Sequence, residues 1–300
     1  MNPTGTPAAK VTTSASRDST QEAFEFVKAL ATELTNGTVS IPSFPEVALR
    51  VQRVLSDENA DAERVVHVLG AEPALAARIL SMANSAALNP SGKPITDLRA
   101  AVARMGFDML RSAAVAFAMA QLSAAQQYKA IEKPMNRIWR RSVEVASLSR
   151  VIARRHRELS ADSAMLAGLL HGVGRLYILT RAARHPKLFA DQGAYQTIVR
   201  DWQADITKAL LETWKINEEL VDAIHGFEDP ERTGRGPLSL GDVLAVGDIV
   251  ASFRETPDLL EAKLQESPSA GRLGINCDSI KLILVDCNVE MNALREALGQ

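Results

Sequence analysis

The sequence predicts an all-α protein, and three observations indicate it. Hydrophobic residues recur every three or four positions along most of the chain, which is the period of an amphipathic helix. The strict alternation of a half-buried strand does not occur. Aromatic residues make up only 5% of the 300 residues whereas hydrophobic residues make up 46%, so the core is expected to consist of aliphatic helix faces.

The chain begins with a polar segment. Residues 1–19 are mostly small and polar, rich in Ser and Thr, and contain no apolar stretch of the kind found in signal peptides. Because this segment has too few apolar side chains to offset the entropy of ordering it, we expect a disordered tail over 1–19. A helix is expected over 20–40, since apolar side chains recur from Phe24 to Leu34 and Asn36-Gly37 is a typical helix end.

Short helices with clear start signals are expected next. Ser43-Phe44-Pro45-Glu46 has the pattern of a capping box, with proline in the tolerated first turn. Asp61 is placed to cap the following helix, and Pro73 suits the first turn of the one after it. Thr96 is then expected to cap a helix that ends at Met105-Gly106, and another helix follows.

Longer helices are predicted in the second half of the chain. One is expected after Pro134, with a buried stripe over residues 138–153. Ser160 is placed to cap the next helix, whose last residues, 166–171, are hydrophobic nearly all round. A helix of that kind usually lies at the centre of a protein, so we expect this one in the core. Further helices, interrupted by one charged loop, follow to the C-terminus.

The charge balance argues against extensive nucleic-acid binding. The formal net charge is −2, whereas phosphate contacts require a basic excess. Residues 62–85 have the outline of a helix-turn-helix. However, the second helix offers only Arg78 and Asn84 as base or phosphate contacts, whereas a recognition helix needs several. Nucleic acid is therefore not expected to be the main partner.

The densest basic segment lies between residues 137 and 157. Such a run is most often a solvated helix face. The alternative is a surface that binds an anionic ligand or an acidic partner, and the residues predicted for it are Arg137, Arg140, Arg150 and Arg154.

Metal-binding motifs are not found among the histidines and cysteines. None of the five histidines forms an H-E-x-x-H pair, and two cysteines, Cys277 and Cys287, are too few for a zinc site or a disulfide framework. His171 alone lies in strongly apolar surroundings. We therefore expect buried thiols, no bound metal and no cofactor.

Several motifs together resemble one family. The segment Ile41-Pro42-Ser43-Phe44-Pro45-Glu46-Val47 resembles the opening signature of the HDOD family, the HD-related output domains. Further matches follow in the same order at 72–75, 82–85, 105–106, 139–142 and 167–174, and the resemblance extends to about Pro230. It implies an N-terminal helical lobe packed against an HD-like helical lobe. We expect an HDOD domain over 41–236 and a C-terminal helical extension over 237–300 that packs on the HD-like lobe.

The resemblance also implies a site. HD-type metal phosphohydrolases hold two metal ions with a histidine, a His-Asp pair and a later aspartate. In this sequence Arg141 falls at the position of the first histidine, and His171 keeps the histidine of the pair. Gln203 lies where many relatives carry a further histidine, and Asp248 corresponds to the last carboxylate. The predicted remnant of the site is therefore a vestigial pocket of these four residues.

The altered residues predict lost catalysis. Gly172 replaces the aspartate of the pair, and Glu228 replaces another histidine found in many relatives. Glycine supplies none of the charge of a bridging aspartate, and an arginine repels divalent cations at close range. One histidine and one distant aspartate cannot hold a hydrolytic metal centre.

These observations predict a non-catalytic regulatory module of signal transduction, cytoplasmic and not membrane-bound. The expected partner is a signalling protein, with a nucleotide or cyclic dinucleotide as a further candidate ligand for the site. Two alternatives remain: a residual HD-type phosphohydrolase that acts on nucleotides, and a nucleic-acid-binding regulator.

Overall fold

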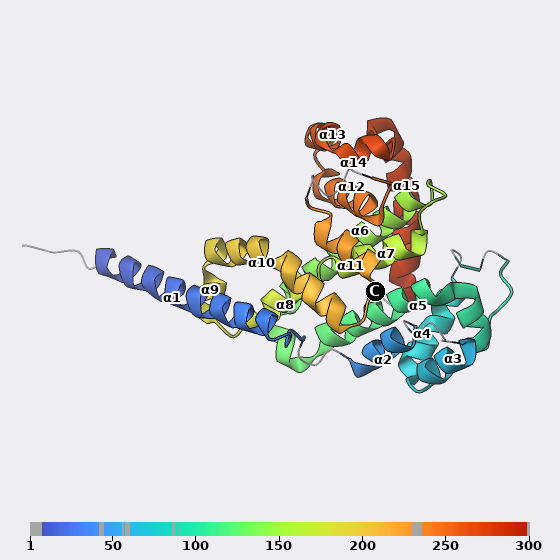
Figure 1. Cartoon of the computed structure of the whole chain (residues 1–300), viewed down its shortest axis with the longest axis horizontal. Coiled ribbons are helices and arrows are strands. Elements are labelled where there is room, and N and C mark those ends of the chain that lie inside the picture. Colours follow the sequence, from blue (N-terminus) through green and yellow to red (C-terminus); the bar gives the residue numbers. More distant parts are fainter. Residues whose placement is uncertain are drawn as a thin grey trace, which may run out of the picture.

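The computed structural model describes residues 8–41, 45–55, 57, 61–85, 88–89, 91–229 and 236–298. Every regular element in these ranges is a helix, as the sequence predicts (Figure 1). None of the helices described there has the length and the apolar character that a membrane span requires.

Two lobes are visible in Figure 1. The N-terminal lobe contains α2 (Glu46–Leu55), α3 (Ala62–Gly70), α4 (Pro73–Ala83) and α5 (Leu98–Ala124). A 3₁₀ helix, η1 (Gln126–Ile131), leads to the HD-like lobe. That lobe contains α6 (Glu132–Ala153), α7 (Ala161–Leu170), α8 (Val173–Ala182), α9 (Pro186–Ala190), α10 (Gln192–Thr213), α11 (Glu218–Gly226) and α12 (Leu240–Phe253). The last helices are α13 (Pro257–Glu266), α14 (Pro268–Arg272) and α15 (Cys277–Leu298).

Local start signals determine several helix ends. The Asp61 carboxylate accepts a hydrogen bond from the Arg64 backbone N–H at 2.7 Å, which confirms the predicted cap of α3. Ser160 caps α7 in the same way. The cap of α5 is Asp97 and not Thr96, because the Asp97 carboxylate lies one residue closer to the first turn and accepts from the Ala100 N–H at 2.8 Å. Ser43, the predicted cap of α2, lies outside the described residues.

The predicted break after Met105 is confirmed inside α5. Gly106 has φ 73° and ψ 167°, so two helical segments meet there at a kink. Residues with a side chain rarely adopt this φ, and glycine does so without steric cost.

The N-terminal helix is longer than predicted. α1 spans Ala8–Thr35, so residues 8–19 are helical and the expected boundary at residue 20 is wrong; residues 1–7 lie outside the described ranges. α1 is anchored to the HD-like lobe at Glu22, whose carboxylate accepts from the backbone N–H groups of Lys187 and Leu188 at the start of α9, both at 3.0 Å. Once a helix is anchored, each added residue avoids the cost of nucleation, which explains the extension through a polar segment.

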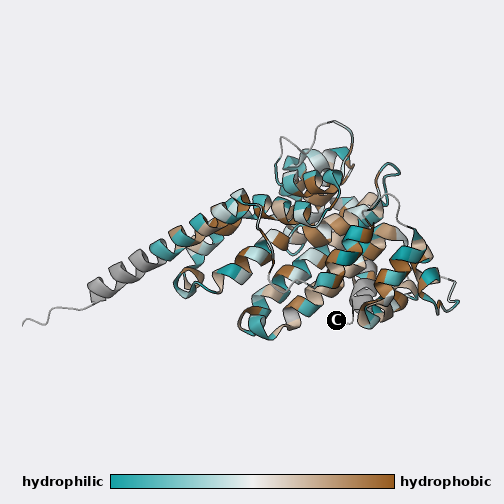
Figure 2. Cartoon of the chain, turned by 60° about the horizontal axis from the view of Figure 1, so that its bottom comes forward, coloured by the Kyte–Doolittle hydropathy of each residue, from teal (hydrophilic) through white to brown (hydrophobic). Residues whose placement is uncertain are grey.

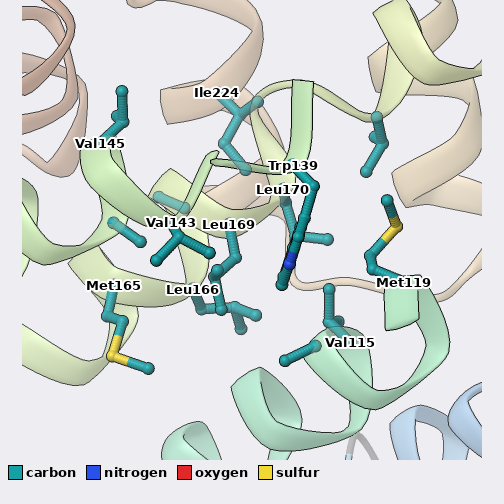
Figure 3. Packing of buried hydrophobic residues seen from close by; sticks show 14 of the residues in the cluster. Val115, Met119, Trp139, Val143, Val145, Met165, Leu166, Leu169, Leu170 and Ile224 are labelled. Atoms are coloured by element: carbon teal, nitrogen blue, oxygen red, sulfur yellow. The ribbon is translucent and has the colours of Figure 1, made fainter. Parts of the chain in front are cut away.

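The core of the HD-like lobe surrounds α7. Residues 164–170 are all buried, as the all-round hydrophobic pattern predicts. Figure 3 shows side chains of α5, α6 and α7 meeting in this core, among them Val115, Trp139 and Leu170. α6 and α7 approach closely at Gly168, where a Cβ atom would collide with the backbone of Ala146. Hydrophobic and hydrophilic residues interleave along the other helices, as amphipathic packing requires (Figure 2).

The C-terminal helices are tied to both lobes. α12 packs against α6 and α7, and α15 packs against α6 and also against α4 of the N-terminal lobe. The buried carboxylate of Asp242 on α12 accepts hydrogen bonds from Ser269 at 2.8 Å and Arg272 at 3.3 Å, which joins α12 to α14. α12 is thus an integral layer of the HD-like lobe, while the predicted boundary between residues 236 and 237 stays a prediction.

Candidate functional site

A cleft of about 870 Å³ opens in the HD-like lobe. Its walls come from α6, α8, α10 and α12, together with residues between these helices. The four residues predicted for the vestigial pocket, Arg141, His171, Gln203 and Asp248, all line it. Sequence positions that are more than 100 residues apart are therefore brought together at one place.

Arg141 on α6 is bound to α12. Its Nη2 atom donates to the Asp248 carboxylate at 2.6 Å, to the Asp248 carbonyl at 2.8 Å and to the Ser252 hydroxyl at 2.6 Å. The Arg141 and Asp248 side chains are 22% and 29% exposed, so water screens this pair only partly. The guanidinium compensates the Asp248 charge through charge-assisted hydrogen bonds.

His171 is buried and neutral. Removal from water lowers the pKa of His171, and the nearby Asp248 carboxylate opposes this effect only in part. The ring Nδ1 lies 2.6 Å from the carbonyl oxygen of Gly168. Because a carbonyl can only accept, Nδ1 carries the proton in the neutral ring and donates it. A T-shaped contact with Phe227, at 6.0 Å between ring centroids, fixes the ring from the other side.

Gln203 belongs to a polar bridge between three segments. Its Oε1 accepts from Arg175 Nε of α8, and its Nε2 donates to both oxygens of Glu228, at 3.0 and 3.2 Å. Arg175 also lies 3.7 Å from Glu228. Arg175 was not among the predicted site residues. The available signal was its position four residues after His171, but the helix break at Gly172 weakens that inference.

Part of the cleft lining is apolar and aromatic. Phe189 and Tyr195 form a T-shaped pair with ring centroids 5.8 Å apart, and Leu179 and Val199 also line the cleft. Burial raises the pKa of Tyr195 to about 12, so the phenol is neutral. These apolar lining residues were not predicted from the sequence, although Tyr195, Val199 and Gln203 follow one another at helical spacing on α10.

The residues present do not fit a dinuclear metal centre. Arg141 places a cation at the position of a ligand, and its hydrogen bonds engage the remaining carboxylate, Asp248. A Cβ atom at Gly172 would lie 2.8 Å from Ser142 Oγ, so a restored aspartate there would displace that hydroxyl. Over the described ranges, no group of three or more His, Cys, Asp and Glu side chains is arranged to hold a metal ion.

The predicted basic surface is not a single face. Arg137 is exposed and lines the cleft, whereas Arg140 is exposed on α6 outside it. Arg150 is buried and donates to Asp162 at 3.0 and 3.1 Å, so its inclusion was wrong. Thirteen residues at 100° per residue rotate Arg150 to nearly the opposite side of α6 from Arg137. Arg154 lies beyond the last turn of α6.

Comparisons with known proteins agree with this architecture. A protein of Shewanella amazonensis, provisionally named a metal-dependent phosphohydrolase, is 26% identical, with a TM-score of 0.69 over 91% of this chain and 99% of that chain. An HDOD domain protein with unknown function from Geobacter sulfurreducens is 23% identical, with a TM-score of 0.60 over 91% and 97%. A provisionally named signal transduction protein of Marinobacter aquaeolei is 20% identical, with a TM-score of 0.59 over 93% and 66%.

A search of the curated proteins gave no match. The family model of the HDOD domain matches residues 41–230, which is more than half of the chain and includes Arg141, His171 and Gln203. The order of motifs, the all-helical two-lobed fold and the family model lead to one conclusion: this chain belongs to the HDOD family.

Proposed function

We propose that the protein is a non-catalytic regulatory module that transmits a signal by binding a separate signalling protein in the cytoplasm. The observation that carries this proposal is the Arg141 guanidinium bound to Asp248 in the cleft. A hydrolase of this kind needs a metal ion to generate a nucleophilic hydroxide. Here the Arg141 guanidinium is hydrogen-bonded to the Asp248 carboxylate, which such a metal ion would need as a ligand.

The test is metal content together with turnover. Protein purified without chelator and then supplied with Mn²⁺, Fe²⁺ or Zn²⁺ is expected to retain far less than one metal ion per chain by elemental analysis. It is also expected to leave an activated phosphodiester, bis(p-nitrophenyl) phosphate, unhydrolysed. The matched control is the double variant Arg141→His/Gly172→Asp, which restores two of the lost ligand types. Near-stoichiometric metal in the unaltered chain, with turnover that a chelator abolishes, would overturn the proposal.

The alternative is a residual HD-type phosphohydrolase that acts on nucleotides. The name of the Shewanella amazonensis protein favours it, because that protein has a TM-score of 0.69 with this chain. The two functions are separated by product analysis: a hydrolase converts a nucleotide, and a regulatory module returns it unchanged.

A further inference from the structure

The cleft has a net positive lining in an acidic protein. Its charged lining residues are Arg137, Arg141, Arg175, Arg200, Glu228 and Asp248. Four cations and two anions give the lining a net charge of +2, whereas the whole chain has −2. His171 adds nothing near neutral pH, because burial lowers its pKa. The local field therefore favours an anion.

The four arginines differ in what they already bind. Arg141 is held by Asp248, and Arg175 is held by Gln203. Among the described residues, Arg200 pairs only with its exposed neighbour Asp201, an interaction that water weakens. Arg137 makes no hydrogen bond or ion pair within the described part of the chain. Its guanidinium therefore presents free donors to the cleft, in the fork geometry that matches phosphate oxygens.

Another part of the cleft lining suits a flat ring with polar edges. Phe189 and Tyr195 supply aromatic surface, and Gln192 and Gln196 of α10 also line the cleft. Amide groups can donate to and accept from the edge of a heterocycle. The volume, about 870 Å³, lies within the range of roughly 300–1,000 Å³ typical of small-molecule sites.

We infer that this cleft binds a nucleotide, with the phosphate at Arg137 and the base against Phe189 and Tyr195. The inference rests on the proposed function, because a regulatory module retains a nucleotide that a hydrolase would consume. It explains why an exposed arginine without a partner among the described residues and an aromatic pair line the same cleft.

The test is calorimetric titration of the full-length, metal-free chain. The probes are AMP, GMP and cyclic di-GMP, with ribose 5-phosphate and inorganic phosphate as ligands that lack the base. At least one nucleotide is expected to bind with a dissociation constant below about 1 mM and at least roughly tenfold more tightly than ribose 5-phosphate. Arg137→Glu is expected to weaken that binding by roughly tenfold or more, because it removes a charge-assisted contact and adds repulsion.

The matched control is Arg140→Glu, which makes the same charge change on the same helix outside the cleft. It is expected to bind the nucleotide as the unaltered chain does. Phe189→Ala is expected to reduce the preference for the nucleotide over ribose 5-phosphate. The inference is overturned if no nucleotide binds, if both charge reversals act equally, or if ribose 5-phosphate binds as tightly as the nucleotide. Chromatography of the recovered ligand separates the two proposals: hydrolysed nucleotide contradicts the regulatory function while leaving the site in place.

Discussion

Replacing Arg141 by alanine should destabilise the fold through the carboxylate that it leaves behind. The substitution removes three hydrogen bonds, all donated by Nη2, and leaves Asp248 without its cation. Orphaning one partner of a fully buried pair costs about 3–5 kcal/mol, and an exposed pair contributes about 0–1 kcal/mol. Because the two side chains are 22% and 29% exposed, water recovers part of this loss, and we expect about 1.5–3 kcal/mol.

Urea denaturation monitored by circular dichroism measures this loss of unfolding free energy directly. Arg140→Ala is the control, since Arg140 is exposed on the same helix, and its effect should stay within about 0.5 kcal/mol. The Arg141→Ala/Asp248→Ala double variant should be less destabilised than the sum of the single variants, since the orphaned charge is gone. The reasoning is refuted if Arg141→Ala unfolds at the same urea concentration as the unaltered chain.

Three further expectations concern pH, packing and the N-terminus. Because burial lowers the pKa of His171, the unfolded chain binds a proton at a higher pH than the folded chain does. The free energy of unfolding should therefore fall as the pH drops below about 6.5, by at most about 1.4 kcal/mol per pH unit. In urea titrations between about pH 7.5 and 5.5, His171→Asn should flatten that fall. Gly168→Ala should cost about 2–4 kcal/mol by thermal or urea denaturation, because its methyl group meets the backbone of Ala146, whereas Gly271→Ala, with open space, should be nearly neutral. Deleting residues 1–19 should shift the melting temperature by less than about 2 °C, and a larger drop would show that this segment docks on the body.

Much of the fold was predictable because its signals are local. A cap needs only one side chain and the N–H groups of the next turn, so Asp61 and Ser160 could be identified from the sequence. The break at Gly106 depends on one residue's backbone freedom. The extent of α1 was not predictable in this way, because an anchor at Glu22 lets the helix continue into a segment that would not be helical alone.

The site was predictable only where residues far apart in the sequence belong to motifs of one family. The resemblance of residues 139–142 and 167–174 to a family placed Arg141 and His171 in one pocket, and the structure does bring them into one cleft. Arg175 was missed because its role depends on Gln203 and Glu228, which lie far away in the sequence. Arg150 was misassigned because a run of basic residues does not record which side of the helix each one occupies.

α12 connects the cleft to the C-terminal helices. Asp248 holds Arg141 at the cleft, and Asp242 holds Ser269 and Arg272 of α14. The two carboxylates are separated by six residues of continuous helix, about 9 Å along its axis. α12 therefore carries, on one uninterrupted helix, the carboxylate that holds Arg141 at the cleft and the carboxylate that fixes α14. The chain continues from α14 into α15, which packs against α4 of the other lobe.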